Sequence, residues 1–129
     1  MYIEIEPNSI VPLYNQLMTQ IKKAILNQNV VNGDALPSVR TLASDLGVNM
    51  HTVNKAYNLM VEEGILSKNQ KGYTIAREAA SDLSTDKVSE LRGRMETLLI
   101  DTFVQGLTLE ETLAWVIEIE QDLKRKGTS

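Results

Sequence analysis

The chain has 129 residues, no cysteine and a formal net charge of −4, from 13 Lys and Arg against 17 Asp and Glu. This length allows one domain with a sizeable core or one small domain with a helical appendage, and the lack of cysteine excludes disulfides, thiolate zinc sites and cysteine nucleophiles. No basic segment precedes an apolar run at the start and no stretch approaches about eighteen apolar residues, so we expect no export signal, no membrane span and a cytoplasmic location.

The first predicted elements are a short strand and a long helix. Residues Tyr2 to Ile5 alternate between apolar and polar side chains, as in an edge strand, and Pro7 ends the run. Pro12 suits a helix start, and we expect the first helix to run from about Pro12 to Asn27. Its apolar face consists of Leu13, Tyr14, Leu17, Ile21, Ala24 and Ile25.

The segment from Leu36 to Tyr57 predicts two short amphipathic helices joined by a glycine turn. Ser38 is a good N-cap for the first helix, and Gly47 supplies the left-handed residue that ends it. Asn49 is a good N-cap for the second. The expected buried stripes are Val39, Leu42, Ala43 and Leu46, then Val53, Ala56, Tyr57 and Met60. Such a pair of helices with a three-residue turn is a helix-turn-helix.

A predicted β-hairpin follows the two helices. Its strands are Ile65 to Lys68 and Tyr73 to Ala76, with a four-residue loop, Asn69 to Gly72, between them. Three helices followed by a hairpin make a winged helix-turn-helix. We therefore expect a mainly α fold with a small β-hairpin, in which this domain covers residues 1–76.

The C-terminal part is predicted to be a linker over residues 77–86 and two helices within residues 87–126. Ser84 or Asp86 is the expected cap of the first helix, which ends at Gly106. Thr108 to Glu111 form a capping box that opens the last helix, and this helix reaches about Lys126.

The last helix is apolar on two faces, and a hairpin of two helices cannot bury both faces alone. We expect a homodimer in which these tails pair, as a four-helix contact or by packing across the other subunit. The alternative is that the second face packs on the winged-helix domain of the same chain. The residues expected at the subunit contact are Leu99, Phe103, Leu113, Trp115, Val116 and Ile119.

The placement of charge favours nucleic-acid binding more than the total charge does. Residues 1–76 hold six cations and six acids, whereas residues 77–129 hold seven cations and eleven acids. Arg40 lies in the first turn of its helix, where a cation opposes the helix dipole by about 0.3 to 1 kcal/mol unless an anion is present. A DNA phosphate on the free amides after Ser38 would be that anion. The alternative is a surface arginine paired with Asp34.

The polar face of the second motif helix is expected to meet bases in the major groove, which a recognition helix enters by its N-terminal end. Asn can bond to adenine, His to guanine or phosphate, and the Thr methyl can contact thymine. The candidates are Asn49, Met50, His51, Thr52, Asn54 and Lys55. Asn58 is further along the helix and is expected to be solvated. One histidine without cysteine predicts no metal site.

The hairpin supplies the remaining candidates, Lys68, Lys71 and Gly72. Cations of a wing approach phosphate or the minor groove, and glycine lets the backbone come close. The alternative is an ordinary polar hairpin. Tyr14 and Tyr57 are assigned to the core on their spacing.

Four motifs stand in the first 76 residues: Pro12-Leu13-Tyr14-x-Gln16, Gly33-Asp34-x-Leu36-Pro37-Ser38-x-Arg40-x-Leu42-Ala43, Leu46-Gly47-Val48-Asn49 and Thr52-Val53-x-Lys55-Ala56-Tyr57. With them the chain resembles the GntR family of bacterial transcription regulators, and its short tail is similar to that of the YtrA-like subfamily. The resemblance implies a dimeric repressor of an operon, often one that encodes an ABC transporter and the regulator itself. It also implies that Arg40 contacts DNA.

Two positions depart from the pattern of the subfamily. Met50 stands where its members usually have proline and other branches often have arginine. The segment Lys71-Gly72-Tyr73-Thr74 offers one glycine where the wing usually carries two.

The sequence therefore predicts a homodimeric repressor that binds double-stranded DNA at a palindromic operator. A winged-helix module that binds a partner protein is the alternative, because the domain has no net positive charge. An enzyme is not expected, since the chain has no glycine-rich phosphate loop, no paired His and carboxylates and no nucleophile with a base at motif spacing. We expect no cofactor, and two tail helices leave little room for an effector pocket.

Overall fold

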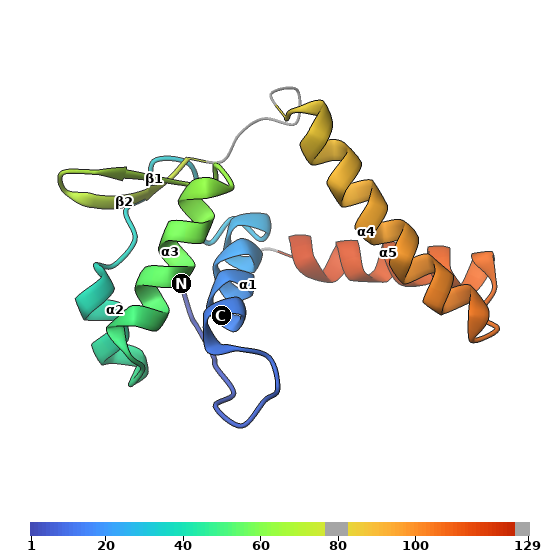
Figure 1. Ribbon diagram of the computed structural model, residues 1–129, viewed down its shortest axis with the longest axis horizontal. Coiled ribbons are helices and arrows are strands. Elements are labelled where there is room, and N and C mark those ends of the chain that lie inside the picture. Colours follow the sequence, from blue (N-terminus) through green and yellow to red (C-terminus); the bar gives the residue numbers. More distant parts are fainter. Residues whose placement is uncertain (77–82, 126–129) are drawn as a thin grey trace. The chain divides into compact units, whose positions relative to one another are not determined.

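The computed structural model describes residues 1–76 and 83–125 of the chain (Figure 1). Contacts between residues divide it into two units, of which the first contains the N-terminal helices and the hairpin and the second contains the last two helices. Within the described residues, no helix combines the length and the apolar character that crossing a membrane requires.

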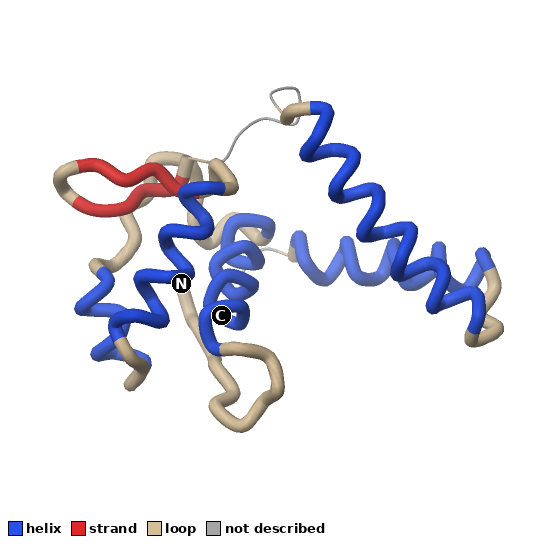
Figure 2. The backbone as a smooth tube through the Cα atoms, viewed as in Figure 1, coloured by secondary structure: helices blue, strands red, loops and turns tan. Residues whose placement is uncertain are grey.

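Three helices and a two-stranded antiparallel sheet form the first unit, which is the predicted winged helix-turn-helix (Figure 2). The elements are α1 (Leu13–Leu26), α2 (Val39–Leu46), α3 (Met50–Glu62), β1 (Leu66–Asn69) and β2 (Gly72–Ile75). Helix α3 packs against α1, α2 and β1 and is thus the centre of the domain.

The predicted caps set the boundaries of the two motif helices. Ser38 Oγ accepts the N–H of Thr41 at 3.0 Å, and Asn49 Oδ1 accepts the N–H of His51 at 2.8 Å. Gly47 ends α2 with a φ of 69°, a left-handed conformation that costs glycine little. These local signals fix the turn between the helices, and with it the motif.

The predicted stripe of α3 is the centre of the core. Val53, Ala56, Tyr57 and Met60 are each 0% exposed. The stripe of α2 is buried at Leu42 and Ala43 and half-buried at its two ends. The remaining core side chains come from the other elements and the turns between them: Leu17, Met18, Ile21, Ala24, Ile25, Val30, Leu36, Leu66, Tyr73 and Ile75.

The hairpin turn is shorter than predicted. Asn69 pairs with Gly72, so the turn consists of Gln70 and Lys71 alone. Asn69 Oδ1 accepts the N–H of Lys71 at 2.9 Å and closes the turn locally. Gly72 has a φ of 129°, which other residues rarely adopt, and this conformation lets it begin β2.

The segment before α2 lies along the free edge of β2. Gly33 N–H donates to Ile75 O at 2.8 Å, Ile75 N–H to Asp34 O at 2.9 Å, and Leu36 N–H to Tyr73 O at 2.9 Å. The start of α2 is therefore tied to the wing through the backbone.

The predicted strand from Tyr2 to Ile5 does not form, and the segment is irregular. The segment before α2 occupies the edge of β2, and residues 2–5 pair with neither strand of the sheet. The N-terminal segment is held instead by the Gln16 side chain. Its Oε1 accepts the N–H of Glu6 at 2.7 Å, while its Nε2 donates to Glu6 O at 3.1 Å and to Val11 O at 2.8 Å.

The second unit contains α4 (Thr85–Val104) and α5 (Leu109–Lys124). Ser84, one of the two predicted caps, accepts the N–H of Lys87 at 3.1 Å. Helix α4 thus begins within the segment 77–86 that we expected to be a linker, of which residues 77–82 lie outside the described part. The end of the last helix expected near residue 126 also lies outside it.

The predicted capping box of α5 forms. Thr108 Oγ1 accepts the N–H of Glu111 at 3.1 Å, and Glu111 Oε1 accepts the N–H of Thr108 at 3.2 Å. The two helices do not pack along each other as the expected hairpin would. No residue of α4 is buried, and Thr112 is the one buried residue of α5.

Candidate nucleic-acid interface

Arg40 is exposed in the first turn of α2 and forms no ion pair within the described part of the chain. Asp34, its proposed alternative partner, instead accepts the N–H of Val31 through Oδ2 at 2.8 Å. The first-turn amides of Val39 and Arg40 precede the first intrahelical bond, whereas Ser38 caps that of Thr41. A guanidinium beside such amides forms a phosphate-binding arrangement.

Ser38 and Asn49 use their side-chain oxygens within the protein. Ser38 Oγ accepts the N–H of Thr41 and also donates to Thr41 Oγ1 at 2.9 Å. Asn49 Oδ1 is engaged by the N–H of His51, which leaves the Nδ2 group of Asn49 as its available donor. The first role of both residues is therefore to cap the N-terminus of a helix, and any contact with DNA is additional to this role.

The N-terminal turns of α3 present an exposed surface opposite the core. Met50, His51 and Asn54 are exposed, and Thr52 is half-buried. Met50 exposes 45% of its surface, so an apolar side chain stands among polar ones. A methionine there can contact a thymine methyl but cannot replace the hydrogen bonds of an arginine.

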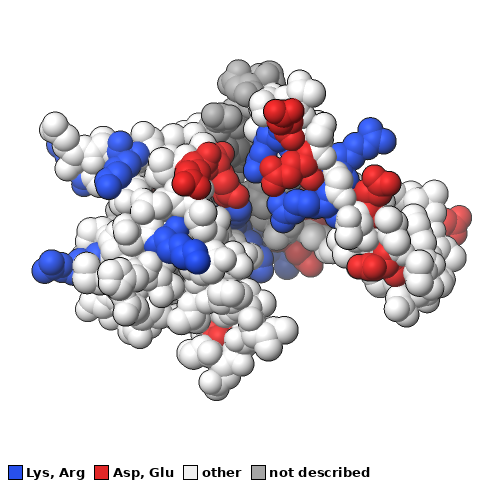
Figure 3. All heavy atoms as spheres, in the orientation of Figure 1, with Lys and Arg blue, Asp and Glu red and all other residues white. Residues whose placement is uncertain are grey.

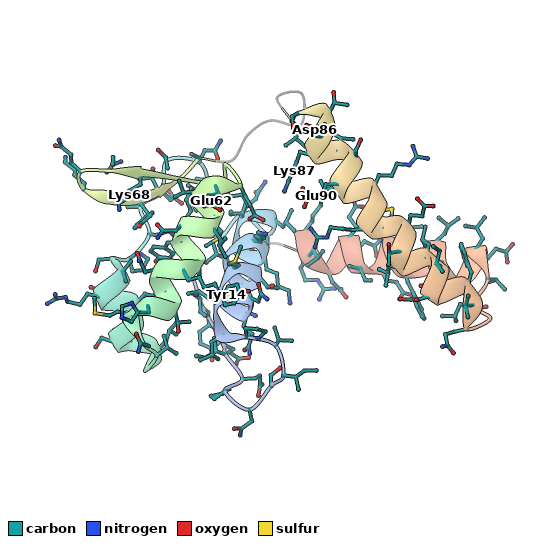
Figure 4. All side chains as sticks on the ribbon, viewed as in Figure 1. Tyr14, Glu62, Lys68, Asp86, Lys87 and Glu90 are labelled. Atoms are coloured by element: carbon teal, nitrogen blue, oxygen red, sulfur yellow. The ribbon has the colours of Figure 1, made fainter. Side chains whose placement is uncertain are left out.

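Lys55 lies closer to α1 than a helical wheel indicates. Its Nζ is 4.0 Å from the centroid of the Tyr14 ring, a cation–π contact. Tyr14 lies on α1 (Figure 4). Tyr14 was assigned to the core, and it is indeed half-buried against it, but its ring also holds this ammonium group. Lys55 is nevertheless exposed.

The wing brings Lys68 and Lys71 to the surface, and both are exposed. Lys68 Nζ is 5.6 Å from the centroid of the Tyr73 ring, its cross-strand neighbour. Gly72 is half-buried, and open space surrounds the position that a Cβ would take, so its conformation and not crowding requires glycine.

Tyr57, which the spacing assigned only to the core, and Tyr73, the first residue of the predicted second strand, both carry specific hydrogen bonds. Tyr57 Oη donates to Pro37 O at 2.8 Å, and Tyr73 Oη donates to Asn58 Oδ1 at 3.2 Å. Asn58 is thus not merely solvated, as we expected, because the wing packs over this end of α3. Lys68 and Tyr73 stand directly on either side of the predicted hairpin loop. This spacing in the sequence could have indicated that the two side chains lie opposite each other, as they do.

Cations gather at the end of the domain that holds the hairpin and α2 (Figure 3). Groups of three or more His, Asp or Glu that could hold a metal ion do not occur in the described residues. Burial, with a smaller contribution from Tyr73, raises the pKa of the Tyr57 hydroxyl, which stays neutral as a donor to Pro37. Arg40, Lys68 and Lys71 thus give this end of the domain a set of exposed cations.

Comparison with known proteins identifies the family of the chain. The family described as bacterial regulatory proteins, gntR family, matches residues 13–75. The chain is 36% identical over 123 residues to the HTH-type transcriptional repressor YtrA of Bacillus subtilis (strain 168), and the match covers 95% of each.

Two solved structures extend the likeness. The crystal structure of a transcriptional antiterminator from Listeria monocytogenes EGD-e has a TM-score of 0.90 and 28% identity, over 100% of this chain and 96% of that one. The DNA-binding domain of AraR in complex with operator ORX1 has a TM-score of 0.52 and 27% identity, over 59% of this chain and 99% of that one. The chain belongs to the GntR family of bacterial regulatory proteins and is a DNA-binding transcription regulator, not an enzyme.

Proposed function

We propose that this chain is a homodimeric repressor that binds a palindromic operator. The observation that supports this most strongly is the set of exposed cationic and polar side chains on three elements: the first turn of α2, the N-terminal turns of α3 and the wing. It lies in a domain similar to that of AraR, whose structure is a complex with operator DNA.

Within this proposal, cations hold phosphate and α3 reads bases. Arg40, Lys55, Lys68 and Lys71 contact the backbone, with Ser38 placing the amides beside Arg40. The base-reading set is Asn49, Met50, His51, Thr52 and Asn54. Gly72 gives the wing its close approach. Bidentate side-chain contacts each contribute about 1 to 3 kcal/mol of discrimination, so few readers per subunit suffice when two subunits bind together.

The second subunit is proposed to cover α4 and α5. The exposed fractions of Phe103, Leu113, Trp115, Val116 and Ile119 lie between 44% and 56%. Leu99 is half-buried. Burial of apolar surface contributes about 25 cal/mol per Å², and these helices achieve little of it within one chain. A second copy is the partner that gives a symmetric arrangement suited to a palindrome.

The regulated operon is proposed to include genes of an ABC transporter together with the gene of the regulator, as the family resemblance implies. An operator sequence recovered by selection from a random pool of DNA tests this proposal, because the sequence must then occur upstream of those genes.

Selection of bound DNA from a random pool tests the function directly. We expect two inverted half-sites whose centres are about one helical turn, roughly 34 Å, apart. The logarithm of affinity should fall against the logarithm of salt concentration with a slope of about −5 to −7, from four cations in each of two subunits. A pool that converges on no sequence, with a slope near zero, would instead indicate a protein-binding module.

A further inference from the structure

Tyr73 of the wing contacts α3 and the segment that leads into α2. Its ring lies beneath Lys68 Nζ of β1, and its centroid is 4.7 Å from that of Tyr57 of α3, at an angle of 63° between the rings. Its hydroxyl donates to Asn58 Oδ1 of α3 at 3.2 Å. Its carbonyl oxygen accepts the N–H of Leu36, two residues before the cap of α2, at 2.9 Å.

These contacts decide the orientation of the wing. Each strand has only four residues, and an isolated hairpin of two strands is marginally stable in water. The direction of the hairpin therefore depends on its backbone bonds to residues 33–36 and on what its buried face packs against. Tyr73 is 7% exposed and is the residue of β2 that reaches α3 with both its ring and its hydroxyl.

The same residue limits the freedom of the wing cation. Lys68 is directly opposite Tyr73 in the register of the sheet. A lysine side chain loses rotamer entropy when it is fixed in one place. An aromatic face that already restrains the ammonium lowers the part of this cost that falls on DNA binding.

We infer that Tyr73 is a positioning residue: through Asn58 and its own ring, it holds Lys68 at a fixed place relative to α3, where both meet one DNA duplex. The inference rests on the proposed function, in which Lys68 contacts phosphate. It predicts that the contribution of Lys68 to DNA affinity depends on the Tyr73 hydroxyl, although this hydroxyl bonds to Asn58 and not to DNA.

A double-mutant cycle on the full-length chain tests the inference. Lys68→Gln is measured with the selected operator in the wild-type, Tyr73→Phe and Asn58→Ala backgrounds. Tyr73→Phe keeps the ring and deletes the bond to Asn58, while Asn58→Ala deletes the same bond from the other side. In the wild type we expect Lys68→Gln to weaken binding by about three- to tenfold and to reduce the salt slope by about two per dimer. In either variant background its effect should fall below about twofold.

Tyr2→Phe is the matched control, because it removes an exposed hydroxyl that bonds only to Glu4, at 3.0 Å, outside the proposed surface. The effect of Lys68→Gln should be undiminished in this background. Thermal unfolding of every variant establishes that affinity is compared between folded proteins.

Equal effects of Lys68→Gln in all backgrounds would overturn the inference and leave the proposed function intact. No effect of Lys68→Gln in the wild type, with binding still abolished by Arg40→Ala, would also overturn it, since Lys68 would then contact nothing that needs positioning. A wild-type protein that binds no operator would remove the proposed function itself.

Discussion

Replacement of Arg40 by alanine separates DNA affinity from protein stability. The side chain is exposed, forms no ion pair in the described part of the chain and lies at the positive end of the α2 dipole. Its removal deletes an unfavourable interaction of about 0.3 to 1 kcal/mol and introduces the best helix former. The melting temperature should therefore stay the same or rise by a few degrees.

The affinity should change in the opposite direction. A hydrogen bond to a charged group contributes about 1.5 to 3 kcal/mol, and a dimer loses one such contact in each subunit. The expected loss is thus about 3 to 6 kcal/mol, or a factor of roughly 10² to 10⁴ in Kd. The salt slope should become less negative by about two.

Fluorescence anisotropy with a labelled operator at about 50 to 200 mM salt measures both quantities, and circular dichroism measures unfolding. Lys23→Ala is the matched control: it removes an exposed cation from the last turn of α1, outside the proposed surface. It should leave affinity within about twofold and lower stability slightly, since a cation there is favourable to the dipole. Unchanged affinity in Arg40→Ala, or an equal loss in Lys23→Ala, would refute the reasoning.

Three further outcomes follow from the geometry. Trp115→Ala should weaken the dimer at least about tenfold in sedimentation equilibrium, because a large apolar side chain that is 47% exposed in one chain is lost from the contact; a dimer that persists unchanged at nanomolar concentration contradicts the interface. Gly72→Ala should lower the melting temperature and weaken operator binding, since a φ of 129° strains alanine, and equal values for both would mean that the turn adapts. Burial raises the pKa of Tyr57 above its ordinary value of 10.0, so the stability that its neutral form contributes is complete below pH 10 and is lost as pH rises further; Tyr57→Phe should flatten this part of the stability profile.

The helix-turn-helix could be predicted because its signals are local. Ser38, Gly47 and Asn49 define both helix ends through their own side chains or backbone, and a stripe repeated every three or four residues fixes the buried face of α3. The predicted strand at Tyr2 failed for the opposite reason. An alternating pattern describes a strand only if the segment meets a sheet edge, and whether it does so is decided by the rest of the chain.

The surroundings of the candidate site were harder to predict than its members. A helical wheel places Lys55 and Asn58 on the polar side of α3, but it contains no information on what α1 and β2 bring to that side. Tyr14 supplies the partner of Lys55, and Tyr73 that of Asn58. In α4 and α5 the apolar pattern likewise identified side chains that are exposed or half-buried in the described chain, and the period does not encode what covers them.

Because residues 1–76 carry no net charge, the contacts of Tyr14 and Tyr73 with lysines matter for the proposed binding of DNA. With as many acids as cations in residues 1–76, non-specific attraction to DNA is weak, so each cation must be used efficiently. Two of the four proposed phosphate contacts, Lys55 and Lys68, already rest on aromatic rings in the free protein. A restrained cation gives up less entropy when it meets phosphate, and it meets phosphate only where the duplex fits the α3 surface. A small number of restrained cations thus favours discrimination between DNA sequences over tight binding to DNA of any sequence.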